Sequence, residues 1–332
     1  MPDSEEPDQS RREFMRRAGC LAASALTGAA RTGLALGQVK AADPAPTSRP
    51  RASTVVQVRA DDIVRDNVIR MDVIGEMLAG VLCRLTDRER PADAWRAILR
   101  PDDVVGIKFN GTGARELATT PQLARVLVRS LVAAGWEPRR LVLIEVSDVL
   151  REQLGTTAPV VGWSAQSHDF GSGKDCFARV LDQVTAIINV PFLKTHNIAG
   201  MTGCLKNLSH ALVRSPSRYH ANHCSPFIAD IVAAAPIRSK LRLHLVNALR
   251  AVFDKGPTAS TETMWPAGAL IGSFDPVAAD TVGLEMLNVQ RSAHGLPPID
   301  DAERPVPYLR DAQRRGLGTM TWDYIRHIKV RF

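Results

Sequence analysis

The 332-residue sequence is poor in aromatic residues, which make up only 5% of it, and no basic run is interleaved with them. A base-stacking surface for nucleic acid is therefore not expected, although the formal net charge of +7 suits an anionic ligand. The cysteines form no CxxC pair, so their spacing does not support a ferredoxin-type iron–sulfur cluster or a zinc ribbon. The GxSxG, HExxH and P-loop patterns of serine hydrolases, zinc peptidases and nucleoside triphosphatases are missing too.

Long apolar runs are also absent, and this shapes the interpretation of the N-terminus. The uncharged, alanine-rich run at 18–30 is shorter than the roughly 20 residues that span a bilayer. It follows SRREFM at 10–15 and precedes the small-residue sequence VKA at 39–41. This order predicts a twin-arginine signal peptide at residues 1–42, recognised by the twin-arginine translocation machinery, and a linker at 43–53. We therefore expect a protein without a stable membrane span, periplasmic or otherwise exported through this pathway.

The remaining residues, 54–332, predict a single large α/β domain with a Rossmann-like layered fold, a mainly parallel sheet and helices on both faces. Strand and helix patterns alternate, and a strand–helix–strand unit at this spacing normally makes a right-handed parallel crossover. Strands are predicted at 54–58, 104–109, 141–146, 185–190, 241–246, 269–273 and 324–330. Helices are predicted at 67–85, from 91, at 120–134, 225–235, 276–287 and 307–315. Thr120 and Asp275 are the predicted N-caps of two of them, each followed by a proline, and Gly135 is predicted to end the helix at 120–134.

Carboxylates are missing from one long segment, residues 183–229, which contains no Asp or Glu. The same segment holds four of the eight histidines and four lysine or arginine residues. Its polar residues are Lys194, His196, Lys206, Asn207, His210, Arg214, Arg218, His220 and His223. Such a local charge field is expected to hold a small anion, a carboxylate or a phosphate.

Parallel α/β sheets bind ligands outside the carboxyl ends of their strands. The strand ends should gather Lys108, Asn110, Glu145, Lys194, His196, Asn247 and Asp254 on one rim. The glycine turn at 200–203 should offer backbone N–H groups and a helix start to the anion.

Three groups of candidate site residues follow. The predicted catalytic residues are His196, as acid or base, with Lys206 and Lys194 neutralising the anion. The predicted anion-binding residues are Lys108, Asn110, Asn207 and Arg218. The predicted metal ligands are His220, His223 and Asp254, because two histidines three residues apart can share one helical face. Asp254 or Asp280 would orient a cation or a histidine.

Several motifs resemble the family catalogued as domain of unknown function 362: DVVGIKFN at 103–110, NVPFLKTH at 189–196, TGCLKNL at 202–208, FDPVAAD at 274–280 and YLRDAQRRGLG at 308–318. The family's activity is not established. Some members carry appended ferredoxin cysteines and an iron–sulfur label, but this chain lacks those cysteines.

The chain also resembles, less closely, the nickel-pincer lactate racemase family. That resemblance implies that Lys206 anchors a pyridinium-type cofactor, that His196 transfers a proton, and that His220 or His223 binds nickel. A metal or organometallic cofactor therefore stays open. The function expected is an enzyme, an oxidoreductase or isomerase, acting on a small anionic substrate; the alternative is a non-catalytic, redox-accessory protein that binds a metal or cofactor.

Overall fold

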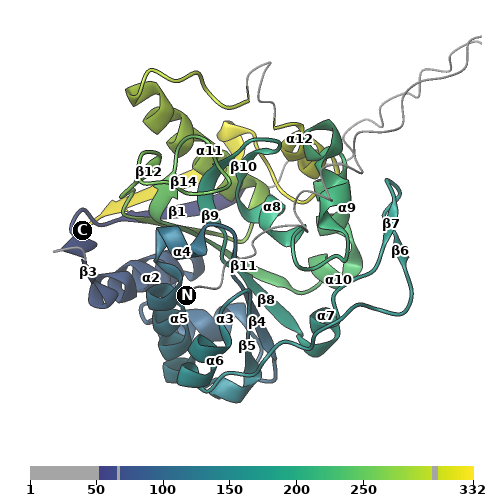
Figure 1. The fold of residues 1–332 in the computed structure, drawn as a ribbon. Coiled ribbons are helices and arrows are strands. Elements are labelled where there is room, and N and C mark those ends of the chain that lie inside the picture. The colour runs from purple at the N-terminus through teal and green to yellow at the C-terminus, as the bar shows by residue number, and fades with distance from the viewer. Residues whose placement is uncertain (1–51, 66–67, 301–305) are drawn as a thin grey trace, which may run out of the picture. The chain divides into compact units, whose positions relative to one another are not determined.

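The computed structural model describes residues 52–65, 68–300 and 306–332, and within them ten strands form one mixed sheet (Figure 1). The order along its main path is β14 (Ile325–Arg331), β1 (Ser53–Arg59), β13 (Ala269–Ser273), β11 (Leu241–Val252), β8 (Ala186–Asn189), β4 (Val105–Lys108) and β5 (Leu141–Ile144). The remaining three strands are β9 (Phe192–His196), which pairs with β11 and with β10 (Gly200–Thr202), and β12 (Met264–Trp265), which pairs with β11. The predicted signal peptide at 1–42 and most of the linker at 43–53 lie outside the described residues.

Most neighbouring strands along the main path are parallel. The pairs β14–β1, β11–β8, β8–β4 and β4–β5 run parallel, whereas β13 is antiparallel to both of its neighbours. The α/β, Rossmann-like fold with a mainly parallel sheet is therefore confirmed.

Helices cover both faces of the sheet because successive strand residues point to opposite sides. In β8, Ala186 and Ile188 join one hydrophobic core, while Ile187 joins the other. The first core lies under α2 (Met71–Thr86), α3 (Pro91–Ile98) and α5 (Thr120–Ala134). The second lies under α8 (Cys204–Leu208), α9 (Phe227–Ala233), α11 (Pro276–Ala293) and α12 (Pro307–Arg314) (Figure 1).

Short elements complete the described chain. The short helices are α4 (Ala114–Leu117), η1 (Pro138–Arg140), α6 (Asp148–Leu154), α7 (Val180–Gln183), η2 (Pro216–Cys224), α10 (Ala235–Arg238) and η3 (Trp322–Tyr324). Two small hairpins pair β2 (Val64–Arg65) with β3 (Val68–Ile69) and β6 (His168–Asp169) with β7 (Lys174–Asp175).

The ends of helices α11 and α5 show which residues in the sequence correctly predicted where a helix begins or ends. The Asp275 side chain accepts hydrogen bonds from the backbone N–H groups of Val277 and Ala278, both at 2.8 Å, and so caps α11 as predicted. Helix α5 ends at Gly135, as predicted, and the φ of 111° at this residue suits glycine. Its N-cap is Thr119 rather than Thr120, and the Thr119 hydroxyl accepts a hydrogen bond from the side-chain amide of Asn247.

Two predictions about the strands were wrong. Strand β11 continues to Val252, so Asn247 lies within a strand and not at its carboxyl end. No strand was predicted directly after Pro191, but Phe192–His196 and Gly200–Thr202 form the antiparallel hairpin β9–β10. The predicted glycine turn at 200–203 is thus part of a strand that leads directly into α8.

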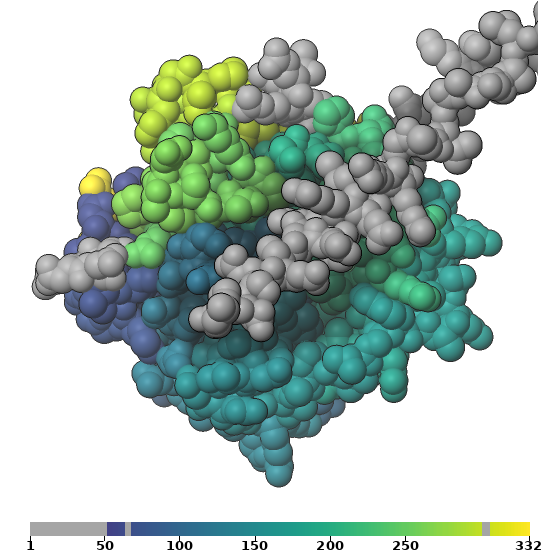
Figure 2. Space-filling model, viewed as in Figure 1, coloured from purple at the N-terminus to yellow at the C-terminus, as the bar shows by residue number. Residues whose placement is uncertain are grey.

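The loop that follows β11 packs on α4, close to the ends of β4 and β9. Val252 and Ala259 form a small apolar cluster with Leu117 and Phe192. Figure 2 shows the green loop lying against the blue segment that contains α4. None of the helices in the described part of the chain is long and apolar enough to cross a membrane.

Candidate functional site

Polar side chains from five segments meet at the carboxyl ends of the parallel strands. Lys108 is the last residue of β4, Glu145 directly follows β5, and β9 carries both Lys194 and His196. Helix α8 adds Lys206, and the chain after it adds two histidines. The lysine–histidine cluster consists of Lys108, Glu145, Lys194, His196, Lys206, His210 and His220. Its position is the one at which parallel α/β sheets bind ligands.

Three buried asparagines form a hydrogen-bond network next to the cluster. The amide of Asn110 donates to Oδ1 of Asn207 at 2.8 Å, and the amide of Asn207 donates to Oδ1 of Asn189 at 2.8 Å. The amide of Asn189 donates to the carbonyl of Cys204 at 2.9 Å. Asn110 and Asn207 were predicted to bind the anion, but the structure commits their amides to this network.

Lys108 and Glu145 form an ion pair in which the lysine is fully buried. The Lys108 ammonium also donates to the carbonyl of Phe109 at 2.7 Å. Burial lowers the pKa of Lys108, and the charge of Glu145 opposes that effect. Burial acts to raise the pKa of Glu145, but Lys108 and a hydrogen bond from His210 lower it to about 2. Because the carboxyl has the lower pKa, the pair is charged, and Glu145 neutralises Lys108. This pairing disfavours the predicted role of Lys108 in binding the anion.

Lys194 lies on β9 with no exposed surface, and two acceptors hold its ammonium. These are Oδ1 of Asn110 at 3.0 Å and the carbonyl of Thr112 at 2.5 Å. Burial lowers the pKa of Lys194 to about 7, and the charge of Lys206 adds to the effect. An amine in this range can give or take a proton near neutral pH.

Lys206 is the cation of the cluster without a partner. Only 6% of its surface is exposed, and no hydrogen bond or ion pair joins its ammonium to any residue in 52–65, 68–300 or 306–332. Burial lowers its pKa, and the nearby Lys108 charge also lowers it. The neighbouring thiol of Cys224 is no counter-ion, because burial raises the pKa of that thiol to about 11.

The start of α8 is occupied by one of the chain's own carboxylates. Asp280 accepts hydrogen bonds from the backbone N–H groups of Cys204 at 2.5 Å and Leu205 at 3.0 Å. A Cβ on Gly203 would lie 2.2 Å from Oδ1 of Asp280, so only glycine allows this contact. The prediction that this helix start receives the ligand is therefore wrong, and Asp280 orients α8 rather than a cation or a histidine.

His196 is held in one tautomer. Its Nδ1 accepts the backbone N–H groups of Ile198 and Ala199, both at 3.2 Å, so the proton of the neutral ring resides on Nε2. Burial lowers the pKa of His196 to about 3, and the charges of Lys206 and His220 add to the effect. A ring that is neutral and already protonated on Nε2 serves as a hydrogen-bond donor, which disfavours the predicted role as a base.

Sequence reasoning missed the pair of His210 and Glu145. Nδ1 of His210 donates to the carboxylate of Glu145 at 3.0 Å, which leaves the Nε2 lone pair of the neutral ring free to accept a proton. The His210 side chain is 42% exposed, whereas that of Glu145 is 15% exposed. A carboxylate-oriented histidine is a general-base arrangement. The available signals were the carboxylate-free segment around His210 and the strand-end position of Glu145.

The predicted metal ligands do not form a site. Among all residues that the structure describes, no three His, Cys, Asp or Glu side chains are placed to hold a metal ion. His220 and His223 donate through Nδ1 to the carbonyls of Ser217 and Ile198, at 3.2 Å each, and a kink with positive φ at His223 separates them. Asp254 instead pairs with Arg291 at 2.8 Å.

The predicted role of Arg218 in binding the anion also fails. Arg218 is exposed, and its guanidinium donates to the carbonyl of Lys174 at 2.9 Å rather than entering the cluster. The cysteines Cys83, Cys176, Cys204 and Cys224 are free. Because none of them joins a three-ligand group, the described cysteines do not fit a ferredoxin-type iron–sulfur cluster.

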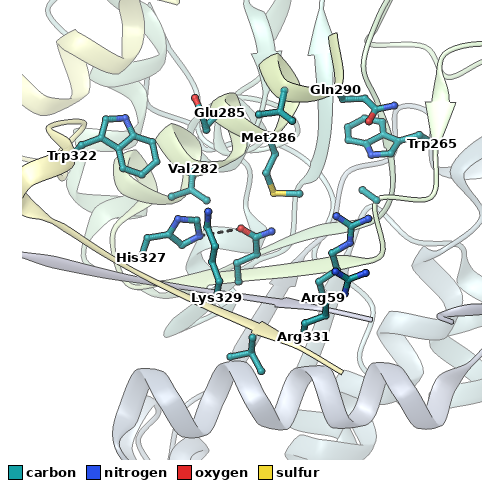
Figure 3. Close-up of a pocket in the computed structure, with 14 residues that line it drawn as sticks. Arg59, Trp265, Val282, Glu285, Met286, Gln290, Trp322, His327, Lys329 and Arg331 are labelled. Carbon is teal, nitrogen blue, oxygen red and sulfur yellow. Dashed lines mark hydrogen bonds between the residues drawn. The ribbon is translucent and has the colours of Figure 1, made fainter. Parts of the chain in front are cut away.

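A cavity of about 720 Å³ lies apart from the cluster, between α11 and the edge strand β14 (Figure 3). Trp265 and Trp322 stand on opposite sides of it, with Met286 between them and Lys329 below. No residue of the lysine–histidine cluster lines this cavity.

The fold and the cluster together define a class: a Rossmann-like α/β protein with cationic and histidine side chains at the carboxyl ends of its parallel strands. The family model described as Domain of unknown function (DUF362) matches residues 105–285, just over half of the chain, and the chain belongs to this family. The match runs from β4 into α11 and includes every residue of the cluster, whereas the motif at 308–318 lies beyond it. No curated protein matches the chain.

Proposed function

We propose that the chain is an exported enzyme that acts on a small anionic substrate, a carboxylate or a phosphate, at the lysine–histidine cluster. The observation that carries this proposal is the unpartnered ammonium of Lys206. A mostly buried ammonium without a protein partner is only partly solvated, which costs folding free energy. An anionic substrate would supply the missing partner.

The charges of the cluster support an anion rather than a cation. Glu145 is the carboxylate within the cluster, and its charge is already matched by Lys108. Lys194 and Lys206 add two cationic groups, and His196 adds a neutral N–H donor. A ligand with one or two negative charges would complete this balance through charge-assisted hydrogen bonds.

The enzymatic part of the proposal rests on groups suited to proton transfer. Lys194, with a pKa of about 7, and the carboxylate-backed His210 both lie in the cluster. A group with a strongly shifted pKa, such as Lys194, is typical of a catalytic site.

Calorimetric titration of inorganic phosphate and oxalate into the full-length protein tests the anion site. We expect at least one of them to bind with one-to-one stoichiometry. Lys206→Met should weaken that binding by about 10- to 100-fold, the equivalent of the ~1.5–3 kcal/mol of a charged hydrogen bond. The matched control is Lys174→Met, which removes an exposed lysine outside the cluster and should leave the affinity unchanged.

A stability measurement shows whether Lys206→Met loses anion binding because it misfolds. Without an anion, Lys206→Met should resist urea at least as well as the wild type, because it removes a buried charge that has no partner. Binding of neither anion to the wild type, or equal affinity of wild type and Lys206→Met, would refute the anion site.

Export is proposed from the signal-like residues 1–42, with Arg11 and Arg12 as the pair read by the translocation machinery. A reporter fused after residue 42 should reach the periplasm and should stay inside when both arginines are replaced by lysine. Export of the double-lysine fusion at the wild-type level would contradict the twin-arginine route.

A further inference from the structure

Two histidines of the cluster are fixed in complementary states. His196 presents an N–H group at Nε2, because backbone N–H groups occupy its Nδ1. His210 presents a lone pair at Nε2, because its Nδ1–H donates to Glu145. Both rings belong to the lysine–histidine cluster, and the carboxylate that holds His210 also pairs with Lys108. The site therefore offers one donor and one acceptor to the same ligand.

We infer that the cluster catalyses removal of a proton from the carbon next to a carbonyl group in a small anionic substrate, with His210 as the base and His196 as the donor to the enolate oxygen. This inference rests on the proposed function and names its substrate class, an oxo acid or a keto phosphate. Lys206 holds the carboxylate or phosphate group, and Glu145 is a positioning residue for His210.

The step is balanced without an oxidant or a cofactor. The C–H bond breaks, its proton goes to Nε2 of His210, and its electron pair forms the carbon–carbon double bond of the enolate. The carbonyl π electrons move to oxygen, which accepts the hydrogen bond from Nε2–H of His196. Return of a proton from His210 to the same or the adjacent carbon regenerates the base and gives exchange or isomerisation.

The environment of His196 suits the donor role. A neutral imidazole matches the proton affinity of an enolate better than an imidazolium does, and burial beside Lys206 keeps this ring neutral. Its ring is stacked on His220, with ring centroids 5.7 Å apart and an interplanar angle of 21°, which limits its rotation. A fixed donor that is ready before charge develops is the arrangement that stabilises oxyanions.

Hydrogen–deuterium exchange tests the inference directly. Pyruvate and dihydroxyacetone phosphate are incubated with the full-length protein in D2O, and the signals of the protons beside the carbonyl are followed by proton NMR. We expect faster exchange than in buffer for at least one of them. His210→Ala should lower the enzymatic rate by about 100-fold or more, the usual contribution of a general base. His196→Ala should lower it by a similar factor of about 100.

Chemical rescue separates catalysis from structure. Imidazole added to the buffer should restore exchange in His210→Ala, because the half-exposed position of His210 admits a small base. A merely structural histidine would show no such rescue. His294→Ala, in an exposed histidine stacked on Phe253 outside the cluster, should exchange at the wild-type rate.

Two results would overturn the inference. The first is phosphate or oxalate binding with no exchange of either probe above the buffer rate, which leaves the anion site intact and removes the enolisation. The second is a stable mass increase on Lys206 after borohydride treatment with pyruvate, which would show an imine as the electron sink. Failure of anion binding itself would instead refute the proposed function.

Discussion

Glu145→Gln is the substitution whose cost follows most directly from the structure. It removes the negative charge beside Lys108, a lysine with no exposed surface. The carbonyl of Phe109 and the amide oxygen of Asn207 remain as acceptors, but neither is an anion. The variant is therefore left with an uncompensated buried ammonium.

Two estimates of the folding free energy lost in Glu145→Gln agree. Removing one partner of a buried ion pair typically costs about 3–5 kcal/mol. Independently, the pKa of Glu145 is lowered from 4.5 to about 2, and a shift of this size corresponds to roughly 3 kcal/mol of folding free energy. Since the Glu145 side chain keeps 15% exposure, we take the lower end, about 3 kcal/mol.

Urea unfolding at pH 7, followed by circular dichroism, measures the loss. The double variant Lys108→Met with Glu145→Gln removes both charges and should recover to within about 1 kcal/mol of the wild type. The pH dependence has a defined sign. A lowered carboxyl pKa stabilises the fold above pH 4.5, and this contribution disappears as the pH falls towards 2. The gap between wild type and Glu145→Gln should therefore close over that range.

A gap below about 1 kcal/mol at pH 7 would refute the reasoning, because it would equal the value of an exposed ion pair. A double variant as unstable as the single one would also refute it, since the loss would then come from packing.

Two further stability predictions concern the start of α8. Burial raises the pKa of Asp280 from 3.8 to about 7, so the wild type should lose stability relative to Asp280→Asn as the pH rises through that window. Thermal midpoints of both proteins at pH 4 and pH 8 measure this change. A difference in midpoint that stays the same at both pH values would contradict the raised pKa of the buried carboxyl. Gly203→Ala should cost about 2 kcal/mol or more in urea, because its Cβ would lie 2.2 Å from Oδ1 of Asp280. Gly75→Ala, within α2 and with nothing within 4 Å of the new Cβ, should instead stabilise the protein by up to about 1 kcal/mol.

Local signals were enough to predict much of the fold. The aspartate–proline pair before α11 and the glycine after α5 act within one turn of the chain, so the sequence shows both the signal and its effect. The apolar runs of β4 and β8 were equally clear, because a strand that is buried on both faces has a nearly continuous apolar sequence.

The hairpin β9–β10 could not be predicted in the same way. Lys194 and His196 are buried within a strand, contrary to the usual pattern of apolar residues inside. For Lys194, two acceptors in the segment after β4, at Asn110 and Thr112, permit this burial. These partners lie more than 80 positions away, as the separations of 84 and 82 show.

Several residues of the lysine–histidine cluster were selected from the sequence, but the contacts among them were not. Lys194, His196 and Lys206 were selected from the carboxylate-free segment, and the structure brings all three together. The ion pair of Lys108 with Glu145 spans 37 positions, and the contact of Cys204 with Asp280 spans 76. Such pairings depend on the tertiary fold, so the sequence could not show that Lys108 was neutralised or that the start of α8 was already occupied.

Lys206 is proposed to anchor the anion site. Anomalous diffraction from crystals of the protein soaked in selenate, a heavy analogue of sulfate and phosphate, tests it most directly. We predict a selenium peak about 3–4 Å from Nζ of Lys206, a hydrogen-bonded oxygen away, and its loss in Lys206→Met crystals. Selenate bound in the cavity beside Lys329, with no peak at the lysine–histidine cluster, would contradict the account.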